Sequence, residues 1–246
     1  MNKAFLNEFH KIGKGYVKIF DDVKDVFLTT RDVCKDCNNR ILRDLDDYFL
    51  DFYRKNIPEK RILKNTKITI SYDFKKLSKW LLKTLYNSER RNVYEQLERK
   101  LHRYKGYIIE KEKFDNSIRI YVELLQDIPR KHTCDFPEES NGKSNILKLG
   151  TIIPSEQYNH SKKDITRYFL SSNIIFHILI FDSEDLTSEK INKRINDYKF
   201  LSKTKKIFYL NPIKKKLILK ASDRTILEIL GNTIEGNKSF IERRKQ

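Results

Sequence analysis

Two cysteines separated by two residues are the clearest chemical feature of this chain. Cys34 and Cys37 stand in residues 32–39, which read DVCKDCNN. Cysteines at this spacing form a tight turn whose thiolates can bind one metal ion, and Zn²⁺ is the metal that such turns hold in structural sites. The alternative is a reduced pair that packs as two small apolar side chains. The spacing therefore predicts either a metal-binding turn or a packed one.

A complete zinc shell needs two further ligands. The third and last cysteine of the chain is Cys134, and His132 precedes it by two residues. These two side chains could complete a Cys3His shell if their segment folded back onto the turn at residues 34–37. Nothing else in the sequence requires that arrangement, so the zinc site stays one of two alternatives.

A single histidine stands in front of the cysteine pair. His10 is the only histidine among the first 100 residues. Because the pKa of imidazole lies near neutrality, a histidine can take a proton from an attacking water molecule. The alternative is an ordinary surface or half-buried histidine with no chemical role.

Short strands and one helix must position these residues. Residues 16–20 and 25–28 are expected to form short strands. From 39 to 53 the apolar residues recur at steps of three and four, which predicts a helix that ends before Pro58. Asn38 or Asn39 is expected to cap its first turn. Asp46 and Asp47 lie in its second turn, and their oxygen atoms suit Mg²⁺ or Mn²⁺.

These features together resemble the treble-clef core of the HNH-type endonucleases, whose motif combines CxxCN with an upstream histidine. The resemblance covers about the first 55 residues, from EFHKIGKG at 8–15 through DVCKDCNN to the Leu45-Asp46-Asp47 step of the helix. It implies metal-dependent hydrolysis of phosphodiester bonds in nucleic acid. His10 would then act as the general base, and Asn38 and Asn39 would fix the geometry of the loop.

The chain departs from the family pattern at two places. The family often has a second CxxC upstream and more often places a metal-binding histidine on the helix, and this sequence has neither. Two functions therefore stay open. One is an HNH-like endonuclease with Mg²⁺ or Mn²⁺ at its catalytic centre and structural Zn²⁺ at Cys34 and Cys37. The other is a catalytically inactive nucleic-acid-binding or interaction module on the same scaffold.

The charge of the chain points to a polyanionic partner. The formal net charge is +17, and residues 1–60 contribute almost none of it, with 12 Lys and Arg against 11 Asp and Glu. Phosphates attract such an excess by Coulomb energy and counterion release. We expect nucleic acid, DNA rather than RNA, with compositional bias toward lysine as the alternative. The oligomeric state stays open.

The densest basic clusters lie behind the cysteine pair and are the candidate nucleic-acid contacts. They are Lys75, Lys76, Lys79, Lys83, Arg90, Arg91, Lys205, Lys206, Lys214, Lys215 and Lys216. The first four are expected on the exposed face of one helix. Phe208 and Tyr209 lie between the last two clusters and could stack on unpaired bases or belong to a core. Solvated basic surfaces are the alternative for each cluster.

Composition and periodicity predict an α+β fold. The resemblance implies a small treble-clef or ββα-like unit at 1–58, and a basic region of mixed helices and antiparallel sheet is expected at 59–246. Helices are expected at 73–85, 88–106, 187–201 and 223–232, and strands at 68–72, 107–110, 117–125, 146–153 and 173–181. A terminal hairpin is expected from 206–210 and 213–221. Without a signal peptide or a run of about 20 apolar residues, no membrane contact is expected, and three cysteines indicate the reducing cytoplasm.

Overall fold

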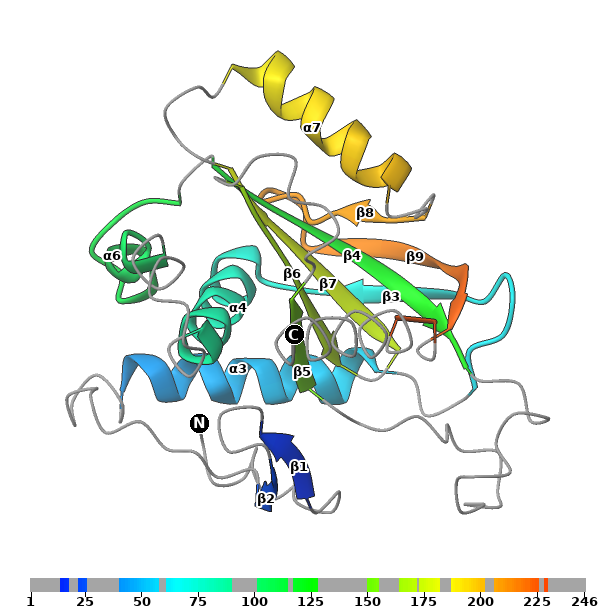
Figure 1. Cartoon of the computed structure of the whole chain (residues 1–246), viewed down its shortest axis with the longest axis horizontal. Coiled ribbons are helices and arrows are strands. Elements are labelled where there is room, and N and C mark those ends of the chain that lie inside the picture. The colour runs from blue at the N-terminus through cyan, green and yellow to red at the C-terminus, as the bar shows by residue number, and fades with distance from the viewer. Residues whose placement is uncertain are drawn as a thin grey trace, which may run out of the picture. The chain divides into compact units, whose positions relative to one another are not determined.

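Figure 1 shows the computed structural model of the chain, with its helices and strands labelled. The described residues are 14–17, 22–25, 40–57, 61–89, 101–114, 117–127, 150–154, 164–171, 173–181, 187–201, 206–225 and 228–229. Helices and a mixed sheet are both present, so the expected α+β class is confirmed. No helix within these ranges combines the length and the apolar composition needed to cross a membrane.

The chain divides into two compact units, and it passes between them more than once. The N-terminal unit comprises Met1–Lys55 and Tyr72–Asp115, and the sheet unit comprises Asn56–Ser71 and Asn116–Gln246. The first crossing lies close to the boundary expected after residue 58. The second expected domain is divided, however, because residues 72–115 fold with the N-terminal unit.

The described part of the N-terminal unit contains a small antiparallel strand pair followed by helices. Strand β1 (Lys14–Val17) pairs with β2 (Asp22–Asp25), with Lys14 opposite Asp25. Helix α3 spans Ile41–Asn56, α4 spans Phe74–Glu89, and the short α6 spans Lys105–Ile108. The helix expected at 39–53 is therefore confirmed as α3.

Helices α3 and α4 pack through their apolar stripes. The residues that recur at helical spacing in α3 are buried: Leu42, Leu45, Phe49 and Phe52. The ring of Phe49 stacks on Trp80 of α4 with centroids 3.5 Å apart. Asp73 caps α4 as expected, since its Oδ1 accepts a hydrogen bond from the Lys76 backbone N–H at 3.1 Å. The core of this unit is thus fixed by the periodicity of the two helices.

Residues 105–110 differ from the predicted strand. The structure places Lys105–Ile108 in α6 and the next residues in a turn, so the strand predicted at 107–110 is wrong. Tyr107 is buried, and its hydroxyl lies 2.7 Å from the Ser78 Oγ on α4. A short apolar run suits a strand or a buried helical turn equally well in periodicity, and packing against α4 decides for the helix.

The sheet unit is built on one mixed sheet. Its order is β3-β9-β4-β7-β6-β5, and β8 also pairs with β4. The strands are β3 (Lys67–Ser71), β4 (Ile118–Gln126), β5 (Gly150–Pro154), β6 (Ile165–Ser171), β7 (Ile174–Ile180), β8 (Phe208–Tyr209) and β9 (Lys216–Thr225). The β4–β9 pair is parallel, and all other pairs are antiparallel.

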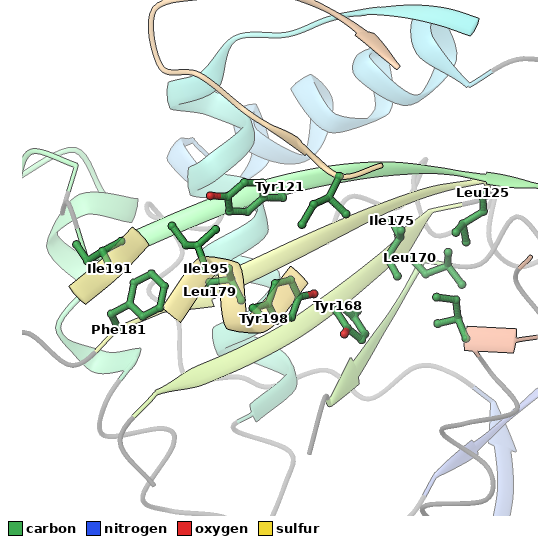
Figure 2. Packing of buried hydrophobic residues seen from close by; sticks show 12 residues of the cluster. Tyr121, Leu125, Tyr168, Leu170, Ile175, Leu179, Phe181, Ile191, Ile195 and Tyr198 are labelled. Carbon is green, nitrogen blue, oxygen red and sulfur yellow. The ribbon is translucent and has the colours of Figure 1, made fainter. Parts of the chain in front are cut away.

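Helix α7 (Ser188–Leu201) covers one face of this sheet. Its buried residues Ile191, Ile195 and Tyr198 follow helical spacing and pack on alternate residues of β4, β6 and β7 (Figure 2). The helix expected at 187–201 and the strand expected at 173–181 are both confirmed. Every residue of β7 is buried, as expected for an unbroken apolar run in a central strand.

The terminal hairpin predicted from 206–210 and 213–221 does not form. Strand β8 pairs with Tyr121 and Val122 of β4, whereas β9 pairs with the same strand further along, from Leu124 to Gln126. Because β7 occupies the other edge of β4, β8 and β9 must follow one another along a single edge. Each segment gains ladder hydrogen bonds with β4 this way, and β9 also pairs with β3.

Candidate functional site

The residues that carry the resemblance lie outside the described part of the chain. These are His10, Cys34, Cys37, Asn38 and Asn39, and the same is true of His132, Cys134, Arg90, Arg91 and Lys205. The elements between and behind them are described. The hairpin β1–β2 lies between His10 and the cysteine pair, and α3 begins two residues after Asn39. The order along the chain is therefore the β1–β2 strand pair, the CxxCNN sequence and α3.

Asp46 and Asp47 do not form the carboxylate pair expected for a shared divalent cation. Asp46 is buried, and its Oδ1 accepts hydrogen bonds from Lys83 Nζ at 2.6 Å and from Trp80 Nε1 at 3.0 Å. Asp47 is exposed and lies 3.6 Å from the Arg43 Nε. Adjacent residues on a helix point about 100° apart, as 3.6 residues per turn requires. One carboxylate therefore faces α4 and the other faces solvent.

Metal ligands do not gather elsewhere in the described chain. Across those ranges, no group of three or more His, Cys, Asp or Glu side chains is close enough to hold a metal ion. Because Asp46 is already engaged by a cation and an indole N–H, it does not fit the role of a metal ligand.

Of the four lysines predicted on the exposed face of helix α4, two lie at the surface and two are buried. Lys75 and Lys76 are exposed, but Lys79 is only 1% exposed and Lys83 only 6%. The Lys79 ammonium donates to Glu110 Oε1 at 2.7 Å. The two buried lysines are therefore unavailable to phosphates, and the prediction of an exposed face is wrong for them.

The partners of Lys83 explain its burial. Besides Asp46, its ammonium donates to the Leu42 carbonyl oxygen at 3.0 Å. Burial lowers the pKa of Lys83, and the Asp46 carboxylate opposes that effect. This contact joins α3 to α4 inside the N-terminal unit, so it serves the packing of the two helices.

The sheet unit contains a buried polar network that the sequence did not reveal. Glu123 of β4 and His177 of β7 are both fully buried, and their Oε2 and Nε2 atoms lie 3.1 Å apart. The His177 Nδ1 lies 2.5 Å from the Tyr198 hydroxyl of α7. Arg224 of β9 donates to both carboxylate oxygens of Glu123, at 3.1 and 2.5 Å. Three strands and one helix thus meet at these four side chains.

The protonation states follow from burial and charge. Burial disfavours ionised Glu123, but the hydrogen bond from His177 and the hydrogen bonds and charge of Arg224 outweigh it and lower the pKa of Glu123 to about 2. Burial lowers the pKa of His177, against the opposing effect of Glu123, so the ring is neutral. Since a carboxylate only accepts, Nε2–H donates to Glu123, and the Tyr198 hydroxyl donates to Nδ1.

A carboxylate that orients a neutral histidine is an arrangement used in general-base catalysis. Here the second ring nitrogen is occupied by Tyr198, whose side chain is buried together with the ring. The Tyr168 ring also packs edge-on against His177, with centroids 4.9 Å apart. The network is therefore closed to a substrate proton, and it holds α7 and β9 on the sheet.

Acid is expected to destabilise the sheet unit through this network. The folded pKa values of His177 and Glu123 both lie below their ordinary values of 6.5 and 4.5. As the pH falls, both groups therefore bind protons more readily in the unfolded chain than in the folded protein. The stabilisation that the network provides above pH about 6.5 is therefore lost progressively as the pH drops toward 2. Urea midpoints at pH 7.5 and 5.5 measure the first part of this loss. His177→Gln should show a smaller difference between the two pH values, and an equal difference would contradict the assignment of a neutral His177.

The C-terminal lysines and aromatics divide between surface and core. Lys214, Lys215 and Lys216 are exposed, and Lys206 lies 3.2 Å from Asp223. Phe208 and Tyr209 form β8 and are half-buried, and the Tyr209 ring packs on Tyr121 with centroids 5.5 Å apart. Tyr209 therefore packs against the core of the sheet unit, as the alternative interpretation held for it.

Searches with protein-family models, curated protein sequences and solved structures each found no match to the chain.

Proposed function

We propose that this chain is an HNH-like endonuclease that hydrolyses phosphodiester bonds in nucleic acid, DNA in preference to RNA. The observation that carries the proposal is the order of its first elements. A histidine at position 10 precedes the strands β1 and β2 in sequence, the CxxCNN motif follows them, and α3 begins two residues after the motif. This is the order that the resemblance of residues 8–47 implies for a ββα nuclease core.

The residues of the N-terminal unit have separate roles in the proposal. His10 takes a proton from the water molecule that attacks the phosphorus atom, which makes that water a better nucleophile. Asn38 and Asn39 hold the turn between hairpin and helix through their side-chain amides. The thiol pair of Cys34 and Cys37 suits Zn²⁺, which would fix the turn. The proposal places the chain in the cytoplasm, where these thiols stay reduced.

The proposal keeps Mg²⁺ or Mn²⁺ as a requirement to be tested. Asp46 does not fit as its ligand, because Lys83 and Trp80 occupy the carboxylate. No catalytic step is therefore assigned to a metal bound at α3. In the proposal, His10 activates the water molecule, and the basic side chains of the protein bind the phosphate backbone of the nucleic acid.

One observation favours a second function, a nucleic-acid-binding module without catalysis. Helix α3, Ile41–Asn56, contains no histidine, whereas HNH-type nucleases more often carry one on this helix. A chain of this kind would bind nucleic acid through the same basic surfaces and leave it intact.

The test uses the purified full-length chain with supercoiled plasmid, linear duplex DNA, single-stranded DNA and RNA. Each substrate is incubated with Mg²⁺, Mn²⁺ or EDTA, and binding is measured in parallel at two salt concentrations. Cleavage that requires a divalent ion is the expected result. Salt-sensitive binding without cleavage of any substrate would contradict the nuclease proposal in favour of the binding module. The absence of both would contradict the two functions together.

A further inference from the structure

The outer end of the sheet in the sheet unit exposes a basic face, of whose lysines the sequence patterns singled out only Lys216. Strands β3 and β9 pair in antiparallel register, with Lys67 opposite Lys220, Thr69 opposite Ile218 and Ser71 opposite Lys216. We name these six residues the β3–β9 face. All are exposed except Lys220, which is half-buried, and Ile218 is 62% exposed. The alternate residues Ile70 and Leu219 on the other face are fully buried.

Positive charge is concentrated here without acidic side chains in the same segments. Residues 61–71 and 206–222 contain eight Lys and Arg and no Asp or Glu. The described ranges provide no carboxylate ion pair for Lys67, Lys216 or Lys220. Lys214 and Lys215 are exposed beside the end of β9. This part of the surface is therefore strongly positive.

The arrangement of the lysines does not help the sheet to fold. Like charges directly opposite one another on paired strands are destabilising, and Lys67 and Lys220 occupy such positions. A bound polyanion would offset that repulsion. Lysines on an end strand can also prevent edge-to-edge aggregation, so the experiment below must separate that role from binding.

We propose that the β3–β9 face binds the phosphate backbone of double-stranded nucleic acid. It carries no aromatic side chain among its six residues, so it offers no platform for stacking unpaired bases. Lysine ammonium and Thr or Ser hydroxyl groups are instead the donors that contact phosphate oxygens. The duplex would be held by its backbone and without base specificity.

The spacing of the charges suits a duplex. Lys216 and Lys220 are four residues apart on one strand, which places their Cα atoms about 13 Å apart at roughly 3.3 Å per residue. The major groove of B-form DNA is about 12 Å wide. The pair Lys67 and Lys220 can therefore contact one side of a groove while Lys216 contacts the other, with uncharged Thr69 and Ile218 between them.

The inference rests on the proposed function in one respect, that nucleic acid is the ligand. Its test measures binding in EDTA and does not depend on cleavage. A fluorescent 20-base-pair duplex is titrated with protein in EDTA at several salt concentrations. The face variant carries Lys67→Gln, Lys216→Gln and Lys220→Gln. The matched control removes the same charge from other exposed positions, with Lys111→Gln, Lys113→Gln and Lys193→Gln.

The face variant is expected to bind the duplex at least about tenfold more weakly. The salt slope, which is the slope of log binding constant against log salt concentration, should fall in magnitude by about three, or about one per phosphate contact. The control should keep the wild-type slope. Ile218→Lys adds a cation at the centre of the face and should tighten binding and raise the slope by about one. That gain provides a test even if the face variant folds poorly.

Several results would overturn the inference. Equal losses in the face variant and the control would assign binding to overall charge, and aggregation of a face variant that binds normally would assign the lysines to edge protection. Tighter binding of single strands than of duplex would contradict the assignment of a duplex. Binding through this face in a chain that never cleaves would support the inference and contradict the nuclease proposal. Cleavage by the wild type together with normal duplex binding by the face variant would support the nuclease proposal and contradict the inference.

Discussion

His10→Ala is expected to reduce the rate of nucleic-acid cleavage by about a hundredfold to ten-thousandfold, the usual contribution of a positioned general base. The affinity for the duplex should not change, because one imidazole contributes little to a surface of many lysines. The measurement is the single-turnover rate of duplex cleavage in Mg²⁺ or Mn²⁺ at saturating protein.

His102→Ala is the matched control for this variant. His102 also belongs to the N-terminal unit and is exposed. Its substitution removes an imidazole of the same kind and should leave the cleavage rate within about twofold of the wild-type rate. Wild-type rates in the His10→Ala variant would contradict the assignment of the base. Equal losses in both variants would show that histidine content, and not position 10, affects the assay.

Glu123→Ala is expected to destabilise the sheet unit by about 3–5 kcal/mol, because it removes one partner of a buried ion pair and leaves the other without compensation. Arg224 would keep its charge, and the His177 Nε2–H would lose its acceptor. With a urea slope of about 3 kcal/mol per molar, the unfolding midpoint should fall by about 1–1.7 M. Circular dichroism in urea at pH 7.5 measures that shift.

Asp223→Ala is the control for an ion pair of the same unit at the surface. Asp223 lies 3.2 Å from the Lys206 ammonium and is 66% exposed. A surface pair contributes about 0–1 kcal/mol, so this midpoint should move by a few tenths of a molar at most. If Glu123→Ala moved the midpoint as little as Asp223→Ala, the network would not hold the strands together in the way its geometry indicates.

The helices and the central strand could be predicted because their own periodicity determines them. The stripe of α3 and the cap of α4 at Asp73 are local features, and both are confirmed. The predicted strand at 107–110 failed because a run of four residues carries too little periodicity to exclude a helical turn. The C-terminal hairpin failed for a different reason: the strand with which β8 and β9 pair, β4, lies about 100 residues away in sequence.

Side-chain partners were harder to predict than elements. The alternation of apolar and charged residues in α4 predicts which face is buried, but it does not show that Lys79 and Lys83 meet Glu110 and Asp46. Those contacts depend on how α3 and residues 105–110 pack against α4. The same packing takes Asp46 away from the cation that its position on the helix suggested.

The sequences of β4 and β7 carry a weak signal for the Glu123–His177 pair. His177 is the single polar residue of β7, IIFHILI, and Glu123 is the single acidic residue of β4, IRIYVELLQ, between Val122 and Leu124. A polar side chain in such a run must be satisfied when it is buried, so a partner on a neighbouring strand was a reasonable expectation. The partner's identity still depended on strand order, which periodicity does not provide. The β3–β9 face depended on register in the same way.

The separation of catalysis from binding tests the central claim most directly. Single-turnover cleavage of a duplex is measured against protein concentration for the wild type, His10→Ala and the variant with Lys67→Gln, Lys216→Gln and Lys220→Gln. We expect His10→Ala to lower the maximal rate and to leave the half-saturating protein concentration unchanged. We expect the lysine variant to raise that concentration and to leave the maximal rate unchanged. Full-rate cleavage by His10→Ala, or no cleavage by the wild type, would contradict the nuclease proposal.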